Sequence, residues 1–206
     1  MTKFDANWVK TEEAKRKHMA ENGLYSEAEE HASCGVGLVV SIDGTPSRKV
    51  VQAGIDALKA VWHRGAVDAD GKTGDGAGIH VQIPVPFFYD QIERTGHTPR
   101  MDELMAVGQV FLPRTDFGAQ ETCRTIVETE VLRMGYYIYG WRHVPVNVSC
   151  LGEKANATRP EIEQILVSNS KGVDEETFER ELYVIRRRIE KAAQVAGIFG
   201  LYLASL

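Results

Sequence analysis

Cys34 is the residue of this sequence that is best placed to act as a nucleophile. It follows the polar stretch EEHAS and opens the apolar run CGVGLVV, where Gly35 and Gly37 let other groups approach the backbone closely. If the bond between Ser33 and Cys34 is cleaved, Cys34 gains an α-amine whose usual pKa of about 7.7 to 8.0 suits a general base. One residue then supplies both thiol and base. Alternatively, Cys34 is a small apolar residue that opens a buried strand.

Three other kinds of site have weaker support. The GKT triplet at 71–73 lacks the glycine that a phosphate-binding loop needs at position 66, which is alanine. The histidines and cysteines form no CxxC or HExxH pattern, so no metal site is predicted. A papain-like pairing of Cys34 with His63, His80 or His143 stays open, but no local signature selects one of them.

The composition of the chain excludes several classes of protein. A net charge of -5 over 206 residues argues against nucleic-acid binding, and the basic run at 186–188 reads as one face of a charged helix. Three widely spaced cysteines disfavour a disulfide framework and favour the cytoplasm. Neither a secretory signal nor an apolar stretch long enough to cross a membrane is present.

Alternating β-prone and helical patterns must position these residues. Residues 1–33 form a polar leader that is expected to be helical in part, and Ser47 is expected to cap a helix that begins at Arg48. Strands are expected at 35–42, 78–88, 107–113, 136–146, 161–169 and 196–206, and further helices at 120–135 and 174–194. The apolar run that reaches Leu206 predicts a domain that continues beyond it.

Three segments in this order resemble a known family. They are CGVGLVV at 34–40, HRGAVDADGKTGDGAGIHVQIP at 63–84 and FERELYVIRRRIE at 178–190. Together they resemble the amino-terminal part of the glutamate synthase large subunit, a type 2 glutamine amidotransferase domain of the N-terminal nucleophile hydrolase class. The resemblance covers residues 34–206, and residues 1–33 resemble the propeptide that this family removes.

The resemblance implies an α+β fold. The family has a four-layer αββα sandwich, in which two antiparallel sheets face each other between layers of helices. Cys34 would open an inner strand, and the sandwich would be incomplete at its carboxyl end. A truncated sandwich leaves apolar sheet surface uncovered, so poor solubility is expected.

The resemblance also implies a reaction. The Cys34 thiolate would attack the side-chain amide of L-glutamine, release ammonia and leave a thioester that water hydrolyses to glutamate. Arg64 and Gly65 match a family pair near the nucleophile, where a guanidinium would favour the thiolate; alternatively, Arg64 binds loop carbonyls at a helix end.

In the whole enzyme the remaining synthase domains use the ammonia to make glutamate from 2-oxoglutarate. They contain FMN and an iron–sulfur cluster, which this segment does not bind, and receive electrons from an NAD(P)H-dependent small subunit or ferredoxin.

Other family positions have less definite roles. Asp70 and Asp75 read as loop architecture, while Trp141 and Arg142 resemble family positions to which no catalytic role is assigned. The Asn-Gly pair that supplies the oxyanion hole in this class has no counterpart in a matching context after Cys34, and Asn22-Gly23 lies in the leader. Because oxyanion donors contribute about 100-fold to 1000-fold in rate, the chain alone is expected to be weakly active or inactive.

Two alternative functions remain. Another type 2 amidotransferase would share the cysteine and the HRG triplet, but not the TGDGAG loop at 73–78. A non-catalytic regulatory or assembly module would keep Cys34 as a buried structural residue. A glutamine-like electrophile separates these readings, because a buried thiol resists it.

Overall fold

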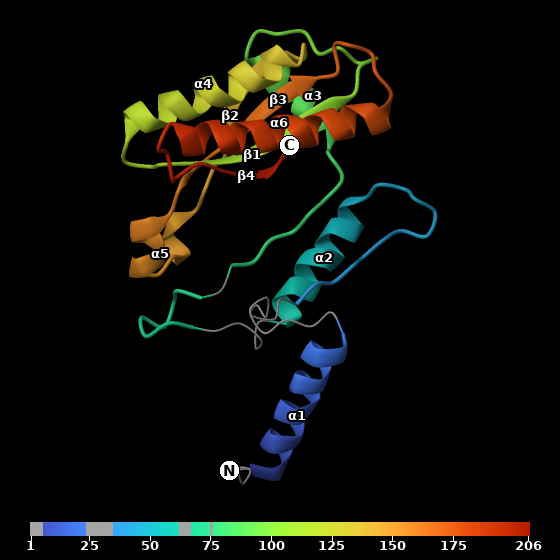
Figure 1. The fold of residues 1–206 in the computed structure, drawn as a ribbon. Helices are drawn as coiled ribbons and strands as arrows, with labels where there is room; N and C mark the ends of the chain where they lie inside the picture. The colour runs from blue at the N-terminus through green and yellow to red at the C-terminus, as the bar shows by residue number, and fades with distance from the viewer. Residues whose placement is uncertain (1–5, 24–34, 62–66, 75) are drawn as a thin grey trace. The chain divides into compact units, whose positions relative to one another are not determined.

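The structure is a computed structural model that describes residues 6–23, 35–61, 67–74 and 76–206 (Figure 1). The chain divides into two units, residues 1–64 and 65–206, and each is described by itself. Across the described ranges no helix is both long and apolar enough to span a lipid bilayer.

The described part of the first unit contains two helices. Helix α1 spans Ala6–Asn22 and helix α2 spans Arg48–Ala60. The Ser47 hydroxyl accepts a hydrogen bond from the Val50 amide at 3.4 Å, which confirms the predicted cap of α2. The partly helical leader is confirmed as well.

The strand that the sequence predicts at 35–42 is not formed. Residues 35–41 have no regular structure, and the side chains of Val36 and Leu38 are 93% and 87% exposed. A strand requires a neighbour for its N–H and C=O groups. In the described part of this unit the regular elements are helices, so the β-prone segment has no strand to pair with.

The second unit is built around an antiparallel sheet with strand order β2-β3-β1-β4. The central strands pair in one register, from Met105 opposite Ser168 to Leu112 opposite Glu161. The bounds are β1 Met105–Leu112, β2 Tyr137–His143, β3 Glu161–Ser168 and β4 Tyr202–Ser205. The sequence predicted all four strands, and the structure confirms them.

Two long helices cover one face of this sheet (Figure 1). They are α4, Phe117–Arg133, and α6, Glu175–Val195, and their amino ends are capped by the carboxylates of Asp116 and Asp174. The main core lies between helices and sheet and includes Val110, Leu112, Cys123, Val127, Val131, Ile165, Val167, Leu182, Ile185 and Ile189. Both predicted helices are thus confirmed.

The other face of the sheet packs against α3, which spans Val85–Arg94. The sequence reading of residues 78–88 as one strand was wrong, because residues 76–84 have no regular structure and the helix follows. Pro86 is tolerated in the first turn, where its missing N–H needs no partner. Phe88 and Ile92 lie one turn apart and pack against Tyr139 and Leu166.

Between β2 and β3 the chain forms a 3₁₀ turn at Val148–Cys150 and the short helix α5 at Glu153–Thr158. The architecture is therefore α+β, with one four-stranded antiparallel sheet. This agrees with the predicted fold class, whereas the four-layer sandwich stays a prediction.

Candidate functional site

The residues that the sequence predicted for catalysis and processing lie outside the described part of the chain. These are Ser33, Cys34, Arg64 and Gly65, and the same holds for His63 and Asp75. Their roles stay predictions. The structure does describe the segments that follow them, residues 35–44 after Cys34 and residues 67–74 after Arg64-Gly65.

The segment after Cys34 ends in a defined turn. The Asp43 carboxylate accepts hydrogen bonds from the Ser41 hydroxyl at 2.5 Å and the Thr45 amide at 3.0 Å. These bonds, that of Ser41 first, lower the pKa of Asp43. Gly44 has a φ of 69°, which favours glycine. The turn that the sequence predicts at Asp43-Gly44 is confirmed.

Residues 67–74 form a closed turn, here called the glycine loop. Val67 and Gly74 form an antiparallel bridge, and the Asp68 amide donates to the Thr73 carbonyl at 2.7 Å. Gly71 has a φ of 69°, and its amide donates to the Asp68 carbonyl at 3.0 Å. The loop therefore has a fixed conformation of its own.

Asp70 holds this turn from inside. Its carboxylate accepts bonds from the amides of Lys72 at 2.9 Å and Thr73 at 2.7 Å, and from the Thr73 hydroxyl at 2.5 Å. The Thr73 hydroxyl is the main reason why the pKa of Asp70 falls from 3.8 to about 2. This agrees with the reading of Asp70 as loop architecture.

A segment far along the chain contacts the glycine loop. Lys154 Nζ lies 2.9 Å and 2.7 Å from the two carboxylate oxygens of Asp68. Gly152, which precedes α5, lies so close to Asp70 and Thr73 that a Cβ on it would overlap their side-chain oxygens. Sequence reasoning missed Gly152 and Lys154, because no local motif marks a contact between positions so far apart.

The glycine loop does not have the surroundings of a phosphate-binding loop. The triplet Gly71-Lys72-Thr73 lies within the turn, and the residues that follow, 76–84, are not helical. A phosphate-binding loop opens directly into a helix. Within the described ranges, no three His, Cys, Asp or Glu side chains come together as metal ligands.

The described cysteines and histidines have other surroundings. Cys123 is fully buried in the core, and burial raises its pKa, so it is a poor nucleophile. Cys150 is exposed and donates to the Asn147 carbonyl at 3.2 Å. His143 lies 3.1 Å from Glu161 across the sheet, and His80 is exposed.

Trp141 and Arg142 have structural contacts. Trp141 Nε1 donates to Glu128 of α4 at 2.7 Å. The Arg142 guanidinium donates to Gln164 at 2.8 Å and Gln91 at 3.2 Å. These bonds join the strand to its neighbouring elements.

Two further sequence readings can be checked. In the basic run of α6, Arg186 and Arg187 both pair with Glu190, which confirms a charged helix face. Asn22-Gly23 lies at the end of α1, where the Gly23 amide donates to the Met19 carbonyl at 2.9 Å.

Comparison with known proteins relates this chain to one family model and to several glutamate synthases. Residues 34–206 match the family of class-II glutamine amidotransferases. The chain is 64% identical over 182 residues to the glutamate synthase [NADPH] large chain of Azospirillum brasilense, covering 88% of this chain and 12% of that protein. It is 35% identical over 189 residues to the glutamate synthase [NADPH] large chain of Bacillus subtilis, covering 89% and 12%. It is 38% identical over 180 residues to ferredoxin-dependent glutamate synthase 1 of Arabidopsis thaliana, covering 86% and 11%.

Proposed function

The chain belongs to the class-II glutamine amidotransferases, and from this membership we propose that residues 34–206 are part of the glutaminase domain of a longer glutamate synthase large chain. The observation that carries the proposal is where the family match begins. It starts at residue 34, the cysteine that the sequence selects as the nucleophile. The chain spans about an eighth of the length of these relatives, so the other steps of glutamate synthesis belong to other parts of the longer protein.

In the proposed reaction, removal of residues 1–33 frees the α-amine of Cys34. The amine takes the thiol proton, and the thiolate attacks the side-chain carbonyl carbon of L-glutamine. The carbon–nitrogen bond breaks, ammonia leaves with the proton from the amine, and a thioester remains. Water hydrolyses the thioester to glutamate and restores the thiol. Arg64 and Gly65 are proposed to lie near the sulfur, where the positive charge favours the thiolate.

The longer protein is proposed to pass the ammonia to a synthase domain that uses 2-oxoglutarate. FMN and the iron–sulfur cluster are proposed to bind in that part of the longer protein. Relatives named for NADPH and for ferredoxin both match the chain, so either donor, through a small subunit or directly, fits the proposal. We also propose that the protein is cytoplasmic; the free thiols of Cys123 and Cys150 support this, because a reducing compartment keeps cysteines unpaired.

The finer fold is part of the same proposal. In a four-layer αββα sandwich, residues 35–42 would form an inner strand that begins at Cys34. The exposure of Val36, Leu38 and Ile42 supports this, because a neighbouring sheet would cover such an apolar surface. A glutaminase of this kind also needs an oxyanion hole, and the proposal places its donors in the longer protein.

The test is an intact-mass measurement on the chain joined to its downstream sequence, before and after treatment with a glutamine-analogue electrophile. We expect a mass that begins at Cys34 and gains one adduct. Cys34→Ala should gain none, and Cys150→Ala, which removes an exposed thiol, should react like the wild type. Active enzyme that retains residues 1–33, or labelling at another cysteine, would contradict the free-amine mechanism.

A further inference from the structure

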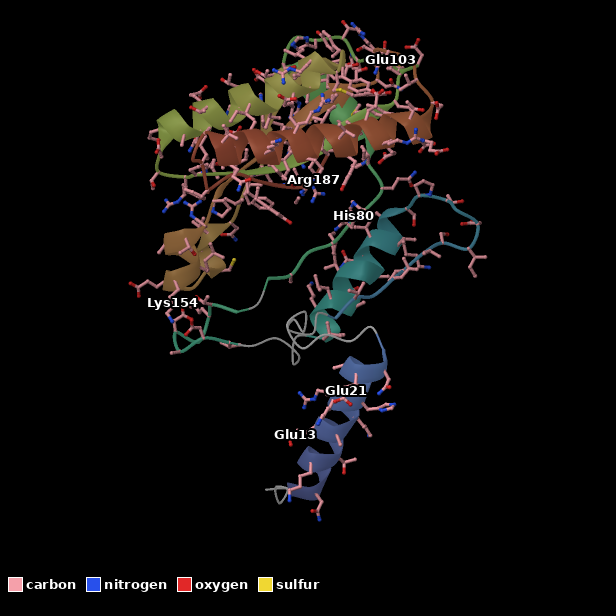
Figure 2. All side chains as sticks on the ribbon, in the orientation of Figure 1. Glu13, Glu21, His80, Glu103, Lys154 and Arg187 are labelled. Atoms are coloured by element: carbon pink, nitrogen blue, oxygen red, sulfur yellow. The ribbon has the colours of Figure 1, made fainter. Side chains whose placement is uncertain are left out.

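We propose that Gly152 and Lys154 are positioning residues that hold the glycine loop in place for the reaction at Cys34. This inference rests on the proposed function. The residues lie at the start of α5, more than 75 positions after the loop, and they contact it at two separate points. Figure 2 shows the Lys154 side chain where α5 meets the loop.

The first point of contact is Gly152. A Cβ at this position would lie 2.7 Å from the Thr73 amide nitrogen and still closer to the side-chain oxygens of Asp70 and Thr73. Backbone cannot move aside as a flexible side chain can. Only glycine therefore permits this approach between the start of α5 and the glycine loop.

The second point of contact is the ion pair of Lys154 with Asp68. The ammonium group contacts both carboxylate oxygens, but the side chains are 66% and 35% exposed. An ion pair this exposed contributes little to overall stability. Its geometry does orient the loop, because Asp68 also bonds to Thr73 through its amide.

Helix α5 has no evident role in the core. Neither α5 nor the preceding 3₁₀ turn contains a buried residue, so their contribution to packing is small. Gly152 and Lys154, at the start of α5, do contact the glycine loop. We therefore assign this segment the placement of the loop rather than the stability of the sheet.

The position of the glycine loop affects the reaction because the loop is close in sequence to Arg64. Asp68 comes four residues after Arg64, and four residues span at most about 14 Å. The Asp70 bonds close residues 70–73 into one turn, and the chain joins this turn to Arg64, which we propose to lie near the sulfur. Small errors in the position of groups near a nucleophile lower the rate of the chemical step.

The ion pair is tested in the full-length protein with Lys154→Ala, Asp68→Asn and the double variant. We expect kcat for glutamine hydrolysis to fall about threefold to tenfold, with KM changed less than kcat. The double variant should be no worse than either single one, because both remove one interaction. Lys154→Arg should restore kcat, since a guanidinium also bonds both carboxylate oxygens. Lys171→Ala, which removes the ion pair with Glu181, is the matched control and should leave kcat unchanged.

The close approach is tested with Gly152→Ala. We expect a fall in kcat of about tenfold to 100-fold, together with faster hydrogen exchange at the amides of Asp68 and Thr73. Gly118→Ala is the control, because a Cβ there would meet its neighbour at an ordinary 3.5 Å. It should change neither quantity.

Several outcomes would overturn the inference. It is wrong if Lys154→Ala and Gly152→Ala keep wild-type kcat, if Lys171→Ala lowers kcat equally, or if exchange in the loop does not change. Failure of the proposed function looks different: the wild type then lacks glutaminase activity, or Cys34→Ala retains it. If the proposed function fails, the role of the glycine loop in this reaction is refuted as well. Unchanged hydrogen exchange in the loop variants would then still refute the claim that Gly152 and Lys154 hold the loop in place.

Discussion

At the scale of single residues, Asp70 stabilises the conformation of the loop in which it lies. Among the described residues, its carboxylate bonds to Lys72 and Thr73, two and three positions further on. An aspartate followed by glycine commonly closes a turn in this way. The sequence therefore permitted a correct reading of Asp70 as loop architecture. The contacts of the loop with Gly152 and Lys154 could not be read from it, because they depend on tertiary structure.

The first prediction concerns acid. Because the pKa of Asp70 is about 2 in the folded turn and 3.8 without these bonds, its carboxylate favours the folded turn above pH 3.8. That contribution is lost as the pH falls from 3.8 through about 2. An NMR titration of the Asp70 carboxyl carbon should give a midpoint near 2, and the Thr73 amide should shift with it. Thr73→Val should raise this midpoint, since the hydroxyl is the main cause of the shift; a wild-type midpoint of 3.8 would contradict the prediction.

At the scale of elements, the reading of the sequence was right for the helices α2, α4 and α6 and for the four strands of the sheet. Helices α4 and α6 bury residues at helical spacing, such as Val127 and Val131 or Ile185 and Ile189, and strand β1 buries alternate residues. The reading was wrong at 78–88, and at 35–42 the described part of the first unit has no strand with which the predicted strand could pair. Both are short apolar runs, and periodicity alone does not separate a strand from a helix or an unpaired segment there. Pro84 and Pro86 stand at the start of α3, where a proline without an N–H is tolerated.

A second prediction concerns the ion pair that joins α4 to the sheet. The Arg124 guanidinium donates to both carboxylate oxygens of Glu163 on β3, at 2.9 Å and 2.6 Å. The Glu163 side chain is only 10% exposed, so Arg124→Ala would leave a carboxylate buried without its partner. We expect the free energy of unfolding to fall by about 3 kcal/mol.

The control for this prediction is Arg180→Ala. Arg180 pairs with Glu176 at 2.8 Å on the exposed face of α6, so its loss should change the free energy of unfolding by less than about 0.5 kcal/mol. Denaturant unfolding followed by circular dichroism measures both variants. Equal effects of the two substitutions would refute a special role for the Arg124 pair.

At the scale of the whole molecule, the apolar segment after Cys34 has large side chains that lie exposed to solvent. Val36, Leu38 and Ile42 are almost wholly exposed, although their pattern is that of a buried strand. A segment of this kind marks a surface that another part of a protein covers. Sequence reasoning and the structure disagree here because the apolar pattern indicates a buried strand, whereas the described part of this unit contains no strand that could pair with it.

A third prediction follows from that exposure. Leu38→Ser should change the free energy of unfolding of the 206-residue chain by less than about 0.5 kcal/mol, because the side chain contacts little. In the longer protein, where we propose that residues 35–42 form an inner strand, the loss should be about 2 kcal/mol or more. Denaturant unfolding of both proteins makes the comparison. A large loss in the short chain, or none in the long one, would contradict the proposed burial.

The strand order β2-β3-β1-β4 also has a consequence during synthesis on the ribosome. β1 is the first strand of the sheet to be made, yet both of its neighbours come later in the chain. Roughly 50 residues separate β1 from β3, so at about 5–20 residues per second β1 waits about 3 to 10 seconds for its first partner. During this wait both edges of an apolar strand are open to other nascent chains. Slower translation should therefore increase aggregation, and a chaperone that covers β1 as it leaves the ribosome should reduce it.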